Sequence, residues 1–323
     1  MRCVTQGVLA IMVLSISLPV FAQAYAIKPV RLIIPAPAGG GMDLVARQMG
    51  PRLTEALGQQ IVMDNRPGAA TIVGVGIAAK APADGYTLLI SSDSAMGLNP
   101  LIYRKLPYDT VKDFAPVALV MRVRAAMLAS GKSNIHSIAD ILRLAREKPG
   151  ALNYGSFGIG SSPHLNLELL KSRTQTDMVH IPYKGPPEVL AALSTGELQV
   201  GYMGTGGPVR AAAKAGTIRV VAVDGSRKHP LFPTVRTLAA DGLEGIQQAW
   251  FAIYAPIGTP EAIISKLNRD LGNIVNDAAF VQASENVLGG EAAHSTPAEL
   301  AALQRLVTES LAPVVKRLNI QLD

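Results

Sequence analysis

The stretch VRLIIPAPAGGGMD (residues 30–43) sets the pattern that the rest of the chain repeats. Its apolar start predicts a strand at residues 30–35, and the prolines and glycines that follow predict a tight loop. An amphipathic segment then predicts a helix over residues 43–57, with Gly58 as its C-terminal stop. A strand that leads through such a loop into a helix is the repeating unit of an α/β protein.

The same alternation of strands and helices continues along most of the chain. It is typical of a parallel sheet with helices on its faces. Near the end, one helix is expected to start at Thr259-Pro260, and another at Thr296, where Thr-Pro-Ala-Glu forms a capping box. The other expected strands are residues 60–64, 86–91, 152–154, 178–182, 198–203 and 218–223, and the other expected helices are residues 72–80, 138–147, 163–171, 187–194 and 208–215.

Two segments are candidates for crossings between two α/β lobes. Residues 117–129 form an apolar run that is too long for one ordinary strand, and residues 250–256 form a second candidate. Two crossings predict a bilobal α/β fold with a ligand cleft and a two-strand hinge. The expected first domain comprises residues 25–124 and 249–323, and the second comprises residues 125–248.

Composition excludes several classes of protein. The 323 residues are 49% hydrophobic, 17% charged and 5% aromatic, with a single cysteine. These values exclude a disordered chain, a collagen, a disulfide scaffold and a polytopic membrane protein. The net charge of +6 comes from scattered basic residues, and few aromatics are interleaved with them, so nucleic-acid binding is not expected.

The first 24 residues have the pattern of a secretory signal peptide. A short segment with one arginine precedes the apolar residues 8–21, and Ala22-Gln23-Ala24 is a small-x-small cleavage signal. Cleavage after Ala24 would remove Cys3. The mature chain would then contain no cysteine, and therefore no disulfide and no cysteine-based zinc site.

The first glycine-rich loop is a candidate anion site. Ala38, Gly39, Gly40 and Gly41 lead directly into the helix that begins near Asp43. Glycines allow a ligand to approach the backbone, and free N–H groups at a helix start favour an anion. The alternative is a plain tight turn in which Asp43 caps the helix.

A second glycine-rich loop lies in the expected second lobe. Ser156, Gly160 and Ser161 precede a helix that starts at Pro163 and contains His164. The two serine hydroxyls and several backbone N–H groups could meet an anion, or the segment could be an ordinary capped loop. The two loops are expected to face each other across the cleft.

Smaller candidates follow other strands, at the edge where open α/β sheets bind ligands. Each of them alone could be an ordinary turn. Asp43 or Asp93 in the cleft could favour an amino or hydroxyl group on the ligand, and Lys184 could offer a cation to a carboxylate. The candidates are Ser92, Asp93, Tyr183, Lys184, Thr205 and Gly206.

Signals for an enzyme are weak. Neither G-x-S-x-G nor H-E-x-x-H occurs, and no two histidines have a metal-binding spacing. Ser161 and His164 could be read as nucleophile and base, but capping or ligand binding is the better use of that hydroxyl. We expect no catalytic residue, no metal and no cofactor.

Several short motifs together resemble the Bug family, the solute receptors of tripartite tricarboxylate transporters. Each motif is weak alone, but together they cover essentially the whole mature chain. The motifs are residues 35–43 with Arg47, residues 65–69, 84–88 and 106–109, Asp113-Phe114, residues 154–161 with His164, and residues 182–185 and 255–260.

The resemblance implies the two-lobed, type II-like fold of periplasmic binding proteins. It also implies a small carboxylate ligand gripped by the two glycine-rich loops, a membrane permease as partner, and a monomeric receptor that closes on its ligand. A ligand sensor that feeds a signalling partner, and a serine-dependent hydrolase, are the alternatives. Four residues depart from the family pattern. Ala36 should widen the first-lobe side of the cleft, and Met42 should add apolar surface there. Arg236 and Ala240 stand where Pro and Glu are usual, and Arg236 could be a second cation or a solvated loop residue.

Overall fold

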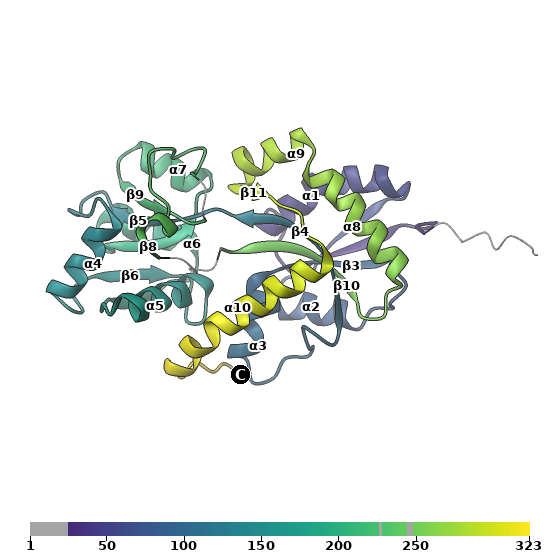
Figure 1. The fold of residues 1–323 in the computed structure, drawn as a ribbon, viewed down its shortest axis with the longest axis horizontal. Helices are drawn as coiled ribbons and strands as arrows, with labels where there is room; N and C mark the ends of the chain where they lie inside the picture. Colours follow the sequence, from purple (N-terminus) through teal and green to yellow (C-terminus); the bar gives the residue numbers. More distant parts are fainter. Residues whose placement is uncertain (1–24, 226–227, 244–247) are drawn as a thin grey trace, which may run out of the picture.

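The computed structural model describes residues 25–225, 228–243 and 248–323, which form two α/β lobes (Figure 1). The expected signal peptide, residues 1–24, lies outside the described residues. Each lobe contains one sheet with helices packed on it. None of the helices in the described ranges is both long enough and apolar enough to cross a membrane.

The sheet of the first lobe has six strands in the order β11-β4-β10-β3-β1-β2. Strand β1 pairs in parallel with β2 and β3, whereas β10 runs antiparallel to both β3 and β4. The strands are β1 (Val30–Ile34), β2 (Ile61–Asn65), β3 (Thr87–Ser92), β4 (Phe114–Val123), β10 (Trp250–Pro256) and β11 (Gly290–Ala292). The helices of this lobe are α1 (Gly41–Leu57), α2 (Ile72–Ala79), α3 (Asn99–Ile102), α8 (Glu261–Val275), α9 (Ala278–Ala283) and α10 (Pro297–Arg317), with single turns η1 (Ser94–Leu98) and η3 (Ser284–Leu288).

The sheet of the second lobe has five strands in the order β7-β6-β8-β5-β9. Strand β6 is parallel to β7 and β8, and β5 is antiparallel to β8 and β9. The strands are β5 (Ala125–Ser130), β6 (Asn153–Ser156), β7 (Val179–Pro182), β8 (Val200–Gly204) and β9 (Ile218–Val223). The helices are α4 (Ile138–Glu147), α5 (Ser162–Thr174), α6 (Pro186–Thr195) and α7 (Gly207–Lys214), with the short turn η2 (Ala239–Asp241).

Both sheets have a hydrophobic core on each face because strand residues alternate in direction. In β1, Leu32 and Ile34 enter one core while Ile33 enters the core on the opposite face. In β5, Met127 and Leu128 divide between two cores in the same way. This accounts for the nearly continuous apolar runs in the sequence, since strands buried on both faces need apolar residues throughout.

The predicted strands and helices are confirmed to within a few residues, and local chemistry explains their ends. Helix α1 ends at Gly58, whose φ of 65° is left-handed and whose N–H donates to the Glu55 carbonyl. Helix α10 begins with the predicted capping box, in which Thr296 and Glu299 bond each other's backbone N–H groups. The N–H groups of Thr296 and Glu299, which have no partner within the helix, thereby gain one.

The parallel pairing expected from the alternation holds for part of each sheet, but the strands nearest the crossings are antiparallel to a neighbour. β4, β5 and β10 each run antiparallel to at least one neighbour. A chain that leaves one sheet for another and later returns must enter in the opposite direction. Hydrophobic alternation is the same for both strand directions, so the pattern could not distinguish them.

The first crossing lies where it was predicted, within residues 117–129. Strand β4 ends at Val123, Arg124 follows, and β5 begins at Ala125 in the other sheet. The second crossing was placed too late, because β10 lies wholly in the first sheet and the chain crosses before Trp250. The two crossings are joined by a hydrogen bond from the Val123 N–H to the Ala249 carbonyl, 2.7 Å long.

The lobes also meet through a hydrophobic cluster, which we call the α3–α5–α10 cluster. Figure 1 shows α10 reaching from the first lobe to α5 of the second. Because these side chains are apolar and buried, the contact favours the observed arrangement of the lobes. The buried members are Leu98 and Ile102 beside α3, Leu165 and Leu169 on α5, and Val307, Leu311, Val314 and Val315 on α10.

Candidate functional site: a cavity between the lobes

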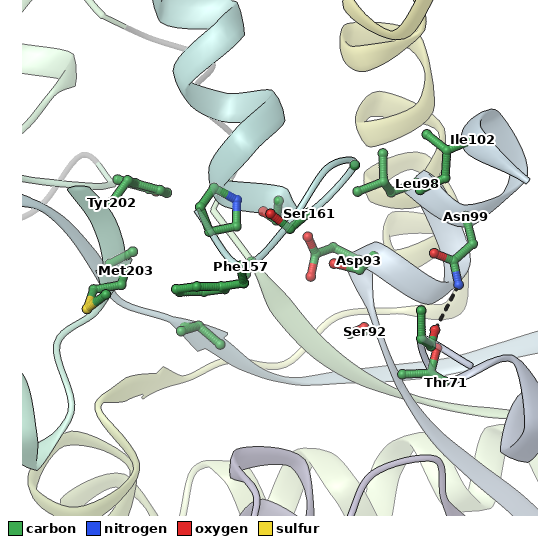
Figure 2. A pocket seen from close by; sticks show the side chains of 18 of the residues that line it. Thr71, Ser92, Asp93, Leu98, Asn99, Ile102, Phe157, Ser161, Tyr202 and Met203 are labelled. Atoms are coloured by element: carbon green, nitrogen blue, oxygen red, sulfur yellow. Dashed lines mark hydrogen bonds between the residues drawn. The ribbon is translucent and has the colours of Figure 1, made fainter. Parts of the chain in front are cut away.

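A cavity of about 450 Å³ lies between the two lobes and is lined by residues of both (Figure 2). It is bounded by the carboxyl ends of β3 and β8 and by the loop that leads into α5. This is the position at which open α/β sheets bind ligands. The residues labelled in Figure 2 are Thr71, Ser92, Asp93, Leu98, Asn99 and Ile102 from the first lobe and Phe157, Ser161, Tyr202 and Met203 from the second.

The walls of this cavity are mainly apolar, with few polar groups. Among the described residues that line it, Asp93 is the one acidic side chain, and none is a lysine, arginine or histidine. An anion in this cavity would therefore have to be held by hydroxyls and backbone N–H groups rather than by a cation. Helix starts supply such N–H groups.

The structure brings four of the fifteen predicted site residues to the cavity wall. These are Ser92 and Asp93 at the end of β3, and Gly160 and Ser161 before α5. The other predicted residues do not line the cavity: Ala38, Gly39, Gly40, Gly41, Asp43, Ser156, His164, Tyr183, Lys184, Thr205 and Gly206.

The first glycine loop is held in shape by the buried carboxylate of Asp43. This carboxylate accepts hydrogen bonds from the Gly39 N–H at 2.8 Å, from Arg47 Nε at 2.7 Å and from Asn65 Nδ2 at 3.0 Å. Burial alone would raise the pKa of Asp43, but the bonds from Arg47, Gly39 and Asn65 hold it below the usual range. Asp43 is thus occupied within its own lobe. The loop reaches the cavity indirectly, because a Cβ on Gly41 would lie 3.9 Å from the Phe251 ring, which lines the wall.

Asp43→Asn should lower stability at neutral pH by about 1–3 kcal/mol, since bonds to a buried charged acceptor are weakened. The folded pKa lies below the unfolded value, so this contribution is complete above about pH 4 and disappears as the pH falls through the folded pKa. Urea unfolding at pH 7 and pH 3 should show a deficit that shrinks in acid. Glu55→Gln, at an exposed site on the same helix, should show little deficit at either pH. An equal deficit of Asp43→Asn at both pH values would contradict the role of its charge.

The second glycine loop folds back on itself before α5. Ser161 Oγ donates to the Gly158 carbonyl at 2.7 Å, and the Gly160 N–H donates to His164 Nδ1 at 3.1 Å. Gly160 has a φ of 78°, and a Cβ there would lie 3.0 Å from Ile102 Cδ1 of the first lobe. Glycine is therefore required both by the backbone conformation and by the close approach of the lobes.

The geometry does not assemble the nucleophile and base that a serine hydrolase would need. The hydrogen bonds of Ser161 and His164 go to their own loop rather than to each other. Ser156 Oγ does lie 2.6 Å from His180 Nε2, but Ser156 is fully buried and does not line the cavity. Burial, and then the neighbouring His164, lower the pKa of His180 to about 4.

The smaller candidates that follow strands other than β3 lie elsewhere: Thr205 and Gly206 lie where the lobes meet, and Tyr183 bonds a residue near the surface. Thr205 Oγ1 donates to the Arg124 carbonyl at 3.1 Å and lies 2.9 Å from His229 Nε2, so it ties β8 to the first crossing. A Cβ on Gly289 would lie 3.1 Å from the Gly206 backbone, which places these two glycines together where the lobes meet. Tyr183 donates its hydroxyl to Glu197.

Lys184 and Arg236, the two candidate cations, are both exposed. Arg236 binds Asp241 Oδ1 at 2.6 Å and the Ala240 carbonyl at 2.7 Å in its own loop. Arg236 is therefore a solvated loop residue, the second of the two alternatives, and it does not line the pocket. Met42, which was expected to add apolar surface to the cleft, is instead buried in a core of the first lobe. Within the described ranges, no group of three or more His, Cys, Asp and Glu residues is arranged to hold a metal ion.

Sequence reasoning missed a strained segment on the first-lobe wall. Ala69, Ala70 and Thr71 all have positive φ, at 43°, 50° and 78°, which is costly for residues other than glycine. Asn99 Nδ2 binds the Ala70 carbonyl at 3.1 Å and helps to hold the segment (Figure 2). Thr71 Oγ1 is buried without a hydrogen-bond partner, at the start of α2. Strain and an unsatisfied hydroxyl at a cavity wall are typical of a binding site.

The apolar residues that line the pocket could not be recognised from their residue types. Phe157, Met203 and Phe251 line the cavity, but their residue types are equally common in cores. Only position offered a signal, since Met203 precedes the end of β8 and Phe157 lies within the second glycine loop. Together with the polar edge, these side chains define a small, largely apolar pocket with a few placed hydrogen-bonding groups.

Two lobes, two crossings and a pocket between them define a solute-binding receptor. The chain belongs to the tripartite tricarboxylate transporter family receptors, because the TctC family model matches residues 45–312. This confirms the resemblance to the Bug family. The chain is 33% identical to Protein BugT of Bordetella pertussis, over 83% of this chain and 82% of that protein. It is also 33% identical to a UPF0065 protein of Pseudomonas sp. strain P51, over 89% of this chain and 85% of that protein.

Solved structures agree with the family and the fold. The structure of R. palustris Rpa4515 with adipate is 30% identical, with a TM-score of 0.77 over 92% of this chain and 99% of that chain. MatC from Rhodopseudomonas palustris with bound malate is 27% identical, with a TM-score of 0.73 over 90% of this chain and 100% of that chain. The predicted bilobal periplasmic-binding-protein fold is thus confirmed.

Proposed function

We propose that this protein captures a small carboxylate in the periplasm and delivers it to the membrane permease of a tripartite transporter. The observation that carries the proposal is the pocket between the lobes. The starts of α2 and α5 meet there beside mainly apolar walls, and none of the described lining residues is a cation. Membership of the receptor family supports the same function. The relatives that bind adipate and malate support a carboxylate as the ligand.

The ligand carboxylate is held on the second glycine loop. Ser161 is the N-cap of α5 and makes no side-chain cap bond, so the first N–H groups of that helix are available to an anion. Gly160 and Ser92 contact the ligand beside it, and the unpartnered Thr71 hydroxyl offers a further donor from the opposite lobe. Asp43 and the first glycine loop support the wall through Phe251 rather than touching the ligand.

The two lobes move as the domains comprising residues 25–124 with 249–323 and residues 125–248. Arg124 lies at the first crossing, where its carbonyl accepts from both the N–H and the hydroxyl of Thr205. Closure is driven by the ligand only to the extent that it binds the closed arrangement better than the open one. Residues 1–24 direct export and are removed after Ala24.

A thermal-shift screen tests the carboxylate assignment. The purified protein is mixed with adipate, malate and other mono-, di- and tricarboxylates, with sugars as the negative set. A ligand at 100 times its dissociation constant adds about 2.7 kcal/mol of stability, which gives a clear rise in melting temperature. Shifts with sugars alone would contradict the proposal.

A matched pair of variants locates the binding event. Ser94 lines the pocket, so Ser94→Trp should fill part of it and abolish the ligand-induced shift, whereas Ser94→Ala should keep the shift. The melting temperature of each variant without ligand reports whether it folds. If folded Ser94→Trp binds carboxylates as well as the unaltered chain does, the ligand binds elsewhere.

A further inference from the structure

Asp93 is a buried carboxylate that faces the pocket. It follows the last residue of β3 and is 4% exposed. Asp93 Oδ1 accepts a hydrogen bond from the Trp250 N–H at 3.4 Å, which fixes the side chain against the neighbouring strand β10. Figure 2 shows its carboxylate directed toward Ser161 across the cavity. Burial raises the pKa of Asp93 to about 6, although N–H donors oppose the rise.

The charge of Asp93 is not balanced within the pocket. None of the described lining residues is a cation. Arg124, a buried arginine at the first crossing, is 3.2 Å from Glu291 and 3.9 Å from Glu285 and does not line the pocket. A second buried acid, Asp224, lies in the second lobe, where it accepts from the hydroxyl of the pocket residue Tyr202 at 3.3 Å, but it does not itself line the pocket. The first-lobe side of the pocket, where Asp93 lies, therefore attracts a cation and repels an anion.

The opposite side of the pocket has the reverse preference. The start of α5 presents backbone N–H groups and the positive end of the helix dipole beside Ser161. The apolar side chains of Leu98, Ile102 and Phe157 line the same pocket. A ligand that fits this pocket carries a carboxylate for the start of α5, an apolar body for the apolar wall and a positively charged donor for Asp93.

We propose that Asp93 binds the ammonium group of the ligand, and that the protein is a receptor for an aminocarboxylate with an apolar body. This inference rests on the proposed function and names the class of carboxylate. A dicarboxylate of the same length would place its second anion against Asp93, in a pocket whose described lining residues include no cation. Asp43, the other acidic candidate, cannot take this role because Arg47, Asn65 and the Gly39 N–H occupy its oxygens.

Matched pairs of probes test the assignment by isothermal titration calorimetry and thermal shift. The pairs are L-leucine with 4-methylpentanoate and 6-aminohexanoate with hexanoate, which differ only in the amino group, with adipate as the dicarboxylate. We expect the unaltered protein to bind the amino member of at least one pair tenfold or more tightly than its partner. Adipate should bind more weakly than that amino member.

Asp93→Asn keeps the shape and the carbonyl oxygen that can accept from Trp250, but it removes the charge. It should reduce the preference for the amino member at least tenfold, with little loss for the amine-free member. Glu55→Gln, which neutralises an exposed carboxylate of the same lobe outside the pocket, should leave the preference unchanged. If Asp93→Asn fails to fold, the unaltered protein still tests the proposal, because it must bind the amino member of a probe pair more tightly than the amine-free member.

The outcomes separate this inference from the proposed function. Equal or tighter binding of the amine-free probes, or a preference that survives in folded Asp93→Asn, would overturn the role of Asp93 while leaving a carboxylate receptor in place. If neither these probes nor any carboxylate of the screen bind, the proposed function fails, and the assignment of the ligand class fails with it.

Discussion

Replacing Gly74 by alanine should destabilise the protein by about 3 kcal/mol, at the upper end of the cost of overpacking. A Cβ at this position would lie 2.7 Å from the Arg66 carbonyl oxygen and 2.7 Å from Pro35 Cβ. Neither neighbour can rotate away, because one is backbone and the other is a ring. Helix α2 would have to shift from the ends of β1 and β2. Thr71, which precedes α2, would move with it at the pocket wall.

The measurement is urea unfolding together with binding of a carboxylate found in the screen. Gly76→Ala on the same helix is the control: a Cβ there meets only the ring of Pro107 at 3.2 Å. The helix propensity of alanine, about 1 kcal/mol better than that of glycine, should offset that contact. We expect Gly76→Ala to stay within about 1 kcal/mol of the unaltered protein. Similar stabilities for the two variants would show that α2 is not pressed against β1 and β2 at Gly74.

Lys171→Met should cost about 3 kcal/mol, since it removes the closest cation from a buried carboxylate. Glu168 on α5 accepts from Lys171 Nζ at 2.7 Å and from the Tyr154 hydroxyl at 2.7 Å, whereas Arg317 lies 3.9 Å away. The melting temperature should fall by about 5 °C. Burial would raise the pKa of Glu168, but Lys171 and Tyr154 hold it below its usual range. The stabilisation by the pair is thus present above about pH 4.3 and is lost as the pH falls through the folded pKa.

A double variant distinguishes two causes of the lost stability: the Glu168 charge left without its cation, and the lost packing of the Lys171 side chain. In Glu168→Gln/Lys171→Met no charge remains buried, and the amide oxygen still accepts from Tyr154. Most of the lost stability should therefore return. A double variant as unstable as Lys171→Met alone would show that the lysine stem, rather than its charge, supports α5. Calorimetry at pH 7 and pH 4 on the unaltered protein and both variants makes the comparison.

Periodicity and capping predicted the elements well, because these signals are local. The helices over Ile138–Glu147 and Pro297–Arg317 follow directly from an apolar stripe and a cap. Strand direction and very short strands such as β11 leave no such trace, since alternation is unchanged by reversing a strand and three residues are too few to show it.

The site was only partly predictable from the sequence, because several of its residues act through partners that are far away along the chain. Asp93 and Ser161 were found because they follow strands and carry polar groups. The roles of Asp43 and Thr205 were not readable, since their partners Asn65 and Arg124 are distant along the chain. The left-handed conformation of Thr71 was also invisible, because a β-branched residue is the last one expected there.

The α3–α5–α10 cluster also bears on the entropy of ligand capture. Two domains joined by flexible strands alone would sample many relative orientations, and freezing them would reduce the free energy of binding. Here apolar side chains of α5 and α10 already restrict those orientations through contacts within the chain itself. A large part of the ordering is thus accomplished by folding rather than at the moment of binding, so the pocket is preorganised for its ligand.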